Sequence, residues 1–473
     1  MSPYVLLFNF FFVLSLLGAG HALLTRKQPN SALVWVALCL SLPVVGVLAY
    51  VIFGVNRVRR SATRLREEFE QQKTTGYLKP PDHRAHTCLL KELPEELIML
   101  EKIGRAMTGT FPLKGNSIRP LFNGKQAYPA MLDAIKSANE SIYLSTFLLD
   151  NDPVGRSFVK SLIEAHERGV HVAVLIDGFG LMLSWRSVVR FLRKQGVPAV
   201  VFLPLSLFPP QIRLNLRNHR KLLVVDGKVG FTGGMNIGGT RSSKGYRRLT
   251  DMHYKLTGPI VSQLQQIFME DWAYSNGEEH QPLPPAMDHT GNILARVIKD
   301  GPDNPDNPLH TSILATISAA KHSVRIMTPY FLPSAELISV LSVAALRGIA
   351  VSIVLPVRSN WPFVHWASRN YFKDLLESGV RIFYQPRPFC HTKLLVIDDC
   401  YVQFGSANMD PRSLQLNFEL NVEVLDMGLA NELIAHVDDT VKLSQEVTHR
   451  EIVNRSLPIR MRDAFFWLFS PYL

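Results

Sequence analysis

The stretch "RNHRKLLVVDGKVGFTGGMN", from Arg217 to Asn236, has a second copy in the same chain, and this repeat decides the fold. The second copy, "HTKLLVIDDCYVQFGSAN", runs from His391 to Asn408. Both copies read His, any residue, Lys, four residues, Asp, six residues, Gly, two residues, Asn. One His-x-Lys pair on a strand is a common coincidence, but two copies that match at five positions indicate a duplicated functional unit.

The segments that precede each copy repeat as well. Helix-like and strand-like patterns alternate in the first half at 127–138, 141–149, 155–169 and 170–178. The same order recurs in the second half at 311–320, 323–332, 336–348 and 349–357. Such alternation predicts α/β units with largely parallel sheets. Two such halves predict an internal duplication about a pseudo-two-fold axis, with the chemistry where the halves meet.

The composition limits the partners and the chemistry. A net charge of +11 favours anionic partners, namely nucleic acid, acidic lipid surfaces or phosphate-bearing substrates. The four cysteines have neither the spacing of a zinc site nor that of a disulfide framework. An apolar fraction of 47% is high for a purely soluble protein and indicates a membrane segment.

Two apolar runs at the start of the chain predict a membrane anchor. Pro3–Leu24 and Ala32–Val55 each have the roughly 20 residues that a helix needs to cross a bilayer. The first run lacks the basic start of a cleaved signal peptide and is longer than its apolar region. The arginines of 57–66 outweigh Arg26 and Lys27 between the runs, so the positive-inside rule predicts both termini in the cytoplasm.

The chain is therefore expected to have four parts. They are a two-helix membrane anchor at 1–56, a connector at 57–114, a first half at 115–285 with the His219 motif, and a second half at 286–473 with the His391 motif.

The motif residues suit phosphate chemistry. Residues two apart on a strand share a face, so His219 and Lys221 lie together, as do His391 and Lys393. Each pair offers an imidazole and a fixed cation to a phosphate. The sequence contains neither a Walker loop nor an HExxH zinc signature, which favours phosphoryl chemistry carried by histidines without a metal or other cofactor.

The remaining motif positions have weaker assignments. Asp226 and Asp398 complete the motifs and are counted with the histidines and lysines as catalytic candidates, but alternation turns them away from the histidines, and turn formation is their simplest role. Two glycines allow backbone to approach an anion and two asparagines offer hydrogen bonds to it; these are Gly233, Gly405, Asn236 and Asn408.

At this point the chain resembles a known family. Paired His-x-Lys-x4-Asp motifs are the signature of the phospholipase D superfamily, and with the apolar N-terminus the chain is similar to bacterial cardiolipin synthases. The supporting stretches are "RPLFNGKQAYPAMLDAI", "RGVHVAVLIDGFG", "RNHRK", "TPYFLP" and "SPYL". The resemblance covers essentially the whole chain. It implies an α/β fold of two phospholipase D-like halves, with the active site at their interface and a transmembrane helix hairpin before them.

The resemblance also implies roles for the residues. His219 would attack phosphorus to form a phosphatidyl-histidine and His391 would act as acid and base, although the sequence alone does not break the symmetry between them. The lysines and asparagines would hold the phosphoryl oxygens. The superfamily places an acid that orients each histidine near Asp251 and Glu419, and which acid serves which histidine stays open.

The implied function is transfer of a phosphatidyl group between two phosphatidylglycerol molecules, giving cardiolipin and glycerol, at the bacterial inner membrane. Water as acceptor would make the protein a hydrolase, and another alcohol would give a different phospholipid. A nuclease is disfavoured because DNA needs no membrane anchor, so no nucleic-acid partner is expected. A non-catalytic scaffold is disfavoured by two intact motifs.

Three apolar stretches leave membrane contact and packing on the domain as open alternatives. They are 200–217, the aromatic 361–372, for which packing is favoured, and the C-terminal 458–473, in which arginines alternate with aromatic residues.

Overall fold

The computed structural model describes residues 3–26, 29–51, 94–204, 216–238, 241–242, 245–246, 249–276, 288–302, 304 and 306–470. The expected contacts of 205–215 with a bilayer, and most of the connector, lie outside these residues. The chain forms two compact units, Met1–Arg64 and Leu65–Leu473.

The first unit contains one helix that is long and apolar enough to cross a membrane, α1 (Pro3–Thr25). The second apolar run is divided into α2 (Pro29–Ser41) and the short α3 (Val45–Ala49), with a turn around Pro43 between them. Proline has no backbone N–H and ends the helical ladder. A second crossing helix is therefore not confirmed, although α1 and α2 pack against each other around Ala22 and Cys39.

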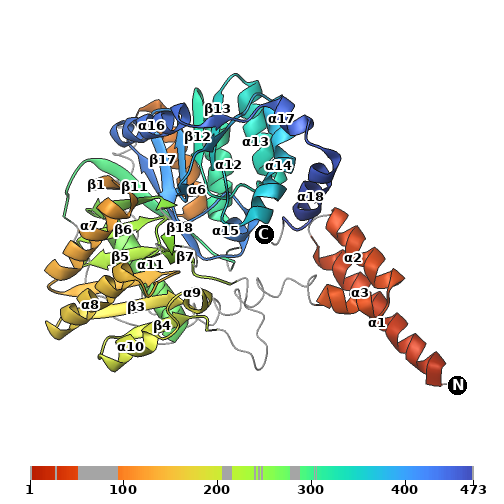
Figure 1. The fold of residues 1–473 in the computed structure, drawn as a ribbon, viewed down its shortest axis with the longest axis horizontal. Coiled ribbons are helices and arrows are strands. Elements are labelled where there is room, and N and C mark those ends of the chain that lie inside the picture. The colour runs from red at the N-terminus through yellow and green to blue at the C-terminus, as the bar shows by residue number, and fades with distance from the viewer. Residues whose placement is uncertain are drawn as a thin grey trace. The chain divides into compact units, whose positions relative to one another are not determined.

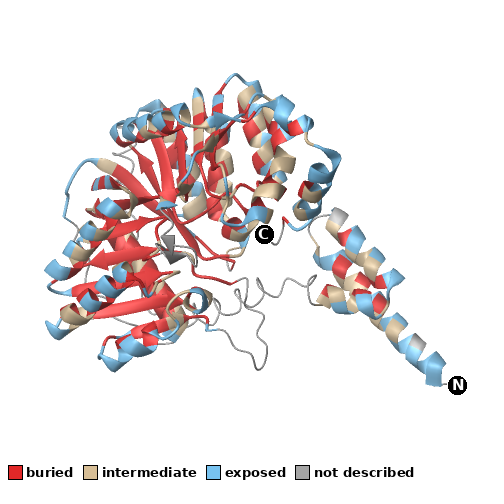
Figure 2. Ribbon diagram, in the orientation of Figure 1, coloured by how far each residue is buried: buried red, intermediate tan, exposed pale blue. Residues whose placement is uncertain are grey.

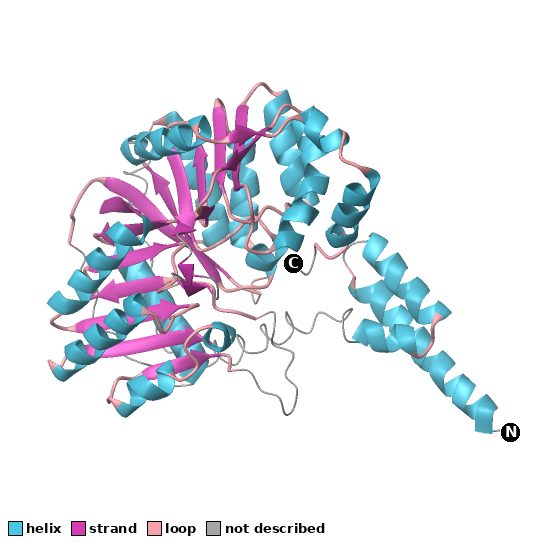
Figure 3. Cartoon of the chain, viewed as in Figure 1, coloured by secondary structure: helices cyan, strands magenta, loops and turns pink. Residues whose placement is uncertain are grey.

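The second unit is built on one 15-stranded sheet whose order is β19-β14-β13-β12-β16-β17-β18-β11-β1-β10-β6-β5-β2-β3-β4 (Figures 1 and 3). The first half supplies β1 (Leu113–Phe122), β2 (Ser141–Thr146), β3 (His171–Asp177), β4 (Ala199–Phe202), β5 (Leu222–Val225), β6 (Val229–Gly233) and β10 (Met252–Thr257). The second half supplies β11 (Ile293–Asp300), β12 (Ser323–Met327), β13 (Ala350–Pro356), β14 (Arg381–Gln385), β16 (Leu394–Ile397), β17 (Tyr401–Gly405), β18 (Glu419–Leu425) and β19 (Gln445–Glu446). Around the central β1–β11 pair, each strand of the first half has a counterpart in the second half, which adds β19 at its edge, and this order confirms the predicted duplication.

The prediction of largely parallel sheets is wrong. In the described part of the large sheet, parallel pairing is confined to β2–β3–β4 and β12–β13–β14, and the strands between these two groups are antiparallel. The predicted alternation of helices and strands is present, and it belongs to the outer strands of the sheet. In the centre, tight turns join β5 to β6, at Asp226, and β16 to β17, at Asp398, and such hairpins are antiparallel.

Helices cover both faces of the sheet, and the buried strands lie between them (Figure 2). In the first half, one face carries α7 (Asn123–Ser137), α8 (Pro153–Glu167) and α10 (Val188–Lys194), while α11 (Ile260–Asn276) stacks Phe268 on Tyr143 of the other face. In the second half, α12 (Pro308–Ala319), α13 (Ala335–Leu346) and α14 (Pro362–Glu377) cover one face, and α16 (Met427–Lys442) contacts the strands as well. The shorter elements are α9 (Gly178–Leu183), α15 (Pro411–Gln415), α17 (His449–Val453), α18 (Leu457–Trp467), β7 (Arg241–Ser242), β8 (Gly245–Tyr246), β9 (Leu249–Thr250) and β15 (Phe389–Cys390).

A helix inside the expected connector, α6 (Glu95–Thr108), belongs to the core of the second half, where Leu97 and Leu100 are buried. The fully buried Arg296 of β11 anchors it by donating to the carbonyl of Glu101 and pairing with Glu423. Gly104 lies against this guanidinium so closely that a Cβ there would overlap it. The residues after about 94 are thus part of the catalytic fold.

Candidate active site

Each motif histidine lies on an extended segment that reaches into the opposite half. His219 precedes β5, and its backbone N–H donates to the carbonyl of Phe418 at 2.9 Å. His391 precedes β16, and its N–H donates to the carbonyl of Thr250 at 2.8 Å. In both places the acceptor residue is followed directly by an acid. The pseudo-two-fold axis therefore brings each histidine beside a carboxylate of the other half.

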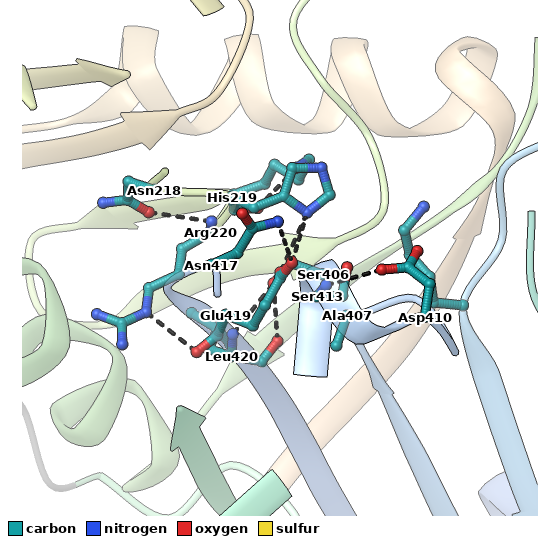
Figure 4. Close-up of polar contacts among 12 residues, drawn as sticks. Asn218, His219, Arg220, Ser406, Ala407, Asp410, Ser413, Asn417, Glu419 and Leu420 are labelled. Atoms are coloured by element: carbon teal, nitrogen blue, oxygen red, sulfur yellow. Dashed lines mark hydrogen bonds and ion pairs between the residues drawn. The ribbon is translucent and has the colours of Figure 1, made fainter. Parts of the chain in front are cut away.

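The two histidine–carboxylate pairs cross between the halves. His219 Nδ1 lies 2.9 and 3.1 Å from the two oxygens of Glu419 (Figure 4). His391 Nδ1 lies 2.9 Å from Asp251 Oδ2. The acid of each pair is buried, and each imidazole keeps about a seventh of its side chain exposed, 13% and 14%. The sequence left open which acid serves which histidine. In the structure, the acid of the second half contacts the histidine of the first half, and the acid of the first half contacts the histidine of the second.

Glu419 has further donors. Ser406 Oγ donates to Glu419 Oε2 at 2.5 Å, and the amide of Asn417 donates to Oε1 at 3.3 Å (Figure 4). Burial acts to raise the pKa of Glu419, but the charge and hydrogen bond of His219, with Lys221 and Ser406, outweigh it and lower that pKa. Glu419 is therefore a carboxylate at neutral pH.

The two lysines are buried beside the histidines. Lys221 Nζ donates to the carbonyl of His219, and Lys393 Nζ to that of His391, each at 2.6 Å. Burial lowers the pKa of Lys221 to about 7 and that of Lys393 to about 8, although nearby carboxylates oppose the shift. A bound phosphate would supply the negative charge that favours both ammonium forms.

The histidines are neutral at pH 7. Burial, and after it the charge of Lys393, lower the pKa of His391 to about 4 against the opposing effect of Asp251. Burial also lowers the pKa of His219, which Glu419 opposes. The charge of Lys393 contributes to the shift of His219 and that of Lys221 to the shift of His391. The four side chains thus share one electrostatic site.

The glycine and asparagine positions lie at the ends of β6 and β17 or just beyond. Gly233 has φ of +146° and pairs closely with His253, and Gly405 pairs as closely with Asn421, so strand pairing already accounts for both glycines. The Oδ1 atoms of Asn236 and Asn408 are buried and have no hydrogen-bond partner among the described residues. Amide oxygens accept and amide nitrogens donate, so an anionic phosphate would engage the Nδ2 groups of these side chains rather than their Oδ1 atoms.

Asp226 and Asp398 are not brought to the histidines. They lie at the other end of β5 and β16, in turns with φ of +51° and +52°. Asp226 accepts hydrogen bonds from the backbone N–H groups of 139–141, where β2 begins. Asp398 accepts from those of 321–323, where β12 begins. The turn role considered for them is what the contacts support.

Sequence reasoning missed several supporting groups. Arg220 forms a buried ion pair with Asp271 and donates to the carbonyl of Glu419 at 3.1 Å, which ties the first motif to the second half. The stretch "RNHRK" contained this arginine, but its partner lies 51 residues away. Phe147 meets the ring of His219 and Tyr330 that of His391, with centroids 5.3 and 6.4 Å apart. Of these two aromatic residues, only Tyr330 lies in a stretch that supported the family resemblance, "TPYFLP".

Within the described residues, no group of three or more His, Cys, Asp or Glu side chains is arranged to hold a metal ion. The positive charge identified at this site comes from the two lysines and Arg220.

Comparison with known proteins identifies the family of the chain. Residues 131–272 and 313–441 match the family described as cardiolipin synthase, PLD-like domain, and residues 7–54 match the phospholipase D-nuclease N-terminal family. The major cardiolipin synthase of Bacillus subtilis (strain 168) is 31% identical over 100% of both chains. A cardiolipin synthase of Alkalihalophilus pseudofirmus is 33% identical over 98% of this chain and 93% of its own.

Among solved structures, the phosphatidylserine synthase of Haemophilus influenzae Rd KW20 aligns with a TM-score of 0.61 over 79% of this chain and 100% of its own. At 15% identity this likeness concerns the fold alone. The full-length matches extend over both histidine motifs and the N-terminal unit. The chain therefore belongs to the cardiolipin synthase family, with two phospholipase D-like halves.

Proposed function

We propose that this protein synthesises cardiolipin by transferring the phosphatidyl group of one phosphatidylglycerol to the free hydroxyl of another. The observation that carries the proposal is the crossed pair of histidines, each with Nδ1 on a carboxylate. This arrangement leaves both Nε2 atoms for chemistry, one to attack phosphorus and one to move a proton. The names of the full-length relatives support cardiolipin as the product.

In the first step, Nε2 of His219 attacks the phosphorus of the donor lipid. His391 enters this step as an imidazolium, because the negative charge of the bound phosphate raises its pKa above that of the empty site. The bond from phosphorus to the oxygen of the headgroup glycerol breaks, and His391 gives its Nε2 proton to that oxygen as glycerol leaves. A phosphatidyl-histidine remains. Glu419 holds the Nδ1 proton of His219 and stabilises the positive charge that develops on the ring.

In the second step, neutral His391 removes the proton from the hydroxyl of a second phosphatidylglycerol. The resulting oxygen attacks phosphorus, the bond from phosphorus to His219 breaks, and cardiolipin forms. Lys221 and Lys393 bind the phosphoryl oxygens in both steps, and Asn236 and Asn408 supply further hydrogen bonds. The assignment of the nucleophile to His219 follows the family, because both histidines have Nδ1 on a carboxylate, although Lys393 Nζ also lies 3.0 Å from Nδ1 of His391.

The membrane arrangement is part of the proposal. The first unit anchors the protein in the inner membrane, and the second unit works on the cytoplasmic side, as two halves of about 115–285 and 286–473. The arginine-rich 57–66 supports this orientation by the positive-inside rule. A reporter fused after Leu473 should be active in the cytoplasm, and a signal only from the other side of the membrane would refute the orientation.

The direct test is incubation of the purified full-length protein with phosphatidylglycerol alone, followed by lipid analysis. Cardiolipin and free glycerol in equal amounts are expected, and exhaustive chelation with EDTA should leave the rate unchanged. Phosphatidic acid as the main product would make the protein a hydrolase instead. A Lys373→Ala variant, changed on an exposed ion pair of α14, is the matched control for handling and folding.

A further inference from the structure

Helix α18 is fixed to the catalytic unit by one face. Asp463 is fully buried there and accepts from Arg369 at 2.7 Å, Arg455 at 2.5 Å and Arg462 at 3.0 Å. On the same side the ring of Phe466 lies 5.1 Å from that of Trp366 of α14. A carboxylate held by three guanidinium groups fixes the rotation of the helix about its axis.

The opposite face of α18 is apolar and uncovered. Its side chains are exposed to 67%, 65%, 56%, 65% and 45% at Leu457, Met461, Phe465, Leu468 and Phe469. The spacing of four, four and three residues places the first four on one stripe of the helix and its C-terminal turn. We call these five residues the docking face. Exposed apolar side chains that are contiguous in this way mark a surface that binds something.

The exposed charges of α18 and of the loop that leads to Trp361 are basic. Asp463, the single acidic residue of α18, is buried, and Arg460 is exposed. The loop that leads to Trp361 carries exposed Arg358, which lines a cavity of about 430 Å³ together with exposed Arg387. Among the described residues, neither Arg358 nor Arg387 forms an ion pair. The surface thus combines apolar and basic groups.

An apolar path connects this surface with the active site. Phe466 stacks with Phe363, which neighbours the half-exposed Trp361. Phe363 and Phe466 pack with Tyr330 on one buried cluster around Leu332. Tyr330 donates to Asn360 at 2.7 Å and meets the ring of His391. Packed aromatic rings therefore link α18 to the His391 side of the site.

We propose that the docking face of α18, with Trp361, seats the catalytic unit on the surface of an anionic bilayer, beside the entrance to the His391 side of the site. An interfacial helix buries its apolar face at the boundary of headgroups and acyl chains, while basic residues bind acidic lipid. A second copy would bring the same basic rim against itself. The N-terminal residues 1–66 contain no acidic residue, so they offer no complementary charge either.

The first test asks what covers the docking face, and it does not depend on the enzymatic activity. A fluorophore is attached at Met461→Cys in a Cys88→Ser background of the full-length protein, since Cys39, Cys390 and Cys400 are buried. The matched control is Leu346→Cys, because Leu346 is 73% exposed but ends α13 at the edge of the sheet where β13 begins. The protein is reconstituted in phosphatidylglycerol vesicles whose acyl chains carry bromine.

The fluorophore at position 461 should be quenched by the brominated chains, and that at 346 should not. Quenching at 461 should weaken in vesicles of neutral lipid and at high salt. A fluorophore at 461 that only aqueous iodide quenches would overturn the proposal. A fluorophore at 461 that neither bromine nor iodide quenches would also overturn it, because the chain would then cover its own helix. Crosslinking at 461 between two copies of the protein would overturn it as well.

The second test rests on the proposed function. Met461→Ser/Phe465→Ser should lower the rate on phosphatidylglycerol in vesicles by about tenfold, because two apolar side chains no longer bind the interface. The rate on dispersed short-chain phosphatidylglycerol should stay the same. Val343→Ser/Leu346→Ser, equally exposed on α13, should change neither rate. Equal losses on both substrates would overturn the docking role, whereas no turnover by the native protein would refute the proposed function alone.

Discussion

The two histidine sites have the same backbone arrangement, but different groups surround their carboxylates. Glu419 receives the hydroxyl of Ser406 and the amide of Asn417 as well as His219. Asp251 receives His391 and the backbone N–H of Met252. At the position that corresponds to Ser406, the first half has Gly234, where a Cβ would lie 2.4 Å from Asp251 Oδ1. A side chain there would push the acid away from its histidine.

This difference shows how a duplicated fold can hold two unlike groups. The strand order fixes both histidines in the same geometry, and one position then sets the environment of each acid. The crossing of the pairs has a further consequence, because neither half contains a complete histidine–acid pair. Each half alone should therefore be inactive, however well it folds.

The largest effect should come from removing either histidine. His219→Ala and His391→Ala should each lower cardiolipin formation by at least about 10⁴-fold, since nucleophile and proton carrier act as a unit. The two losses should differ in kind. His219→Ala should form no lipid adduct, whereas His391→Ala should form a phosphatidyl-histidine slowly and retain it. Mass spectrometry after exposure to phosphatidylglycerol checks this, and an adduct on His391 in the His219→Ala protein would reverse the assignment.

Substitution of the two acids should have the next largest effect on the rate. Glu419→Gln and Asp251→Asn keep the shape but let the amide present the wrong group to Nδ1, so each should cost about 10³-fold in kcat. The loss should be greater for Glu419→Gln, because Ser406 and Asn417 already donate to that oxygen pair and an amide NH₂ would face them. Steady-state rates on short-chain phosphatidylglycerol measure the difference. Equal losses would show that the extra donors do not distinguish the sites.

The lysines should set the alkaline limit of activity. With pKa values lowered by burial to about 7 and about 8, Lys221 and Lys393 lose their protons as pH rises, and phosphate binding weakens. The value of kcat/KM should therefore fall by about tenfold per pH unit between about 7 and about 8, and more steeply above, where both lysines are neutral. The limb for kcat should lie higher because bound phosphate favours the ammonium forms. Lys393→Arg should move the limb upward. A native limb above about pH 9 would contradict this origin.

Ser406→Ala tests the asymmetry itself. It removes one hydrogen bond to a buried carboxylate, which is worth about 1.5 kcal/mol or roughly tenfold in rate. The change should raise the pKa of Glu419 and so move the acid limb of kcat/KM to higher pH. Thr232→Val removes a buried hydroxyl that, among the described residues, donates to the carbonyl of Lys221; it is the control and should leave the limb in place.

Much of the fold could be predicted from local patterns. The apolar spacing at 127–138 and 141–149 corresponds to α7 and β2, because each element is encoded in its own residues. The antiparallel centre could not be predicted this way, since strand partners are set by contacts between distant segments. The second apolar run is long enough to cross a bilayer, yet Pro43 divides it into two helices. A count of apolar residues does not take the helix-breaking effect of proline into account.

The site shows the same division between local and distant information. The histidines and lysines were found because the motif repeats along the chain. The pairing of Glu419 with His219 depends on the axis that relates the halves, and Asp271 is joined to Arg220 only after α11 has packed. No spacing in the sequence reports these contacts. Asp226 was grouped with the catalytic residues because it belongs to the motif, although its contacts are at the far end of β5.

The smallest effect on chemistry should therefore come from the motif aspartates. Asp226→Ala and Asp398→Ala each remove a carboxylate that accepts three backbone N–H groups and leave a non-glycine residue at positive φ, so each should lower the free energy of unfolding by about 2–4 kcal/mol. The rate per folded molecule should stay within about threefold of native. Asp226→Asn keeps an acceptor and tolerates that φ, and it should recover most of the stability. Thermal unfolding and active-site titration with a phosphatidyl adduct measure the two quantities. A stable Asp226→Ala protein with no turnover would show that Asp226 is a catalytic residue. It would then be wrong that one end of the motif serves chemistry and the other end serves stability.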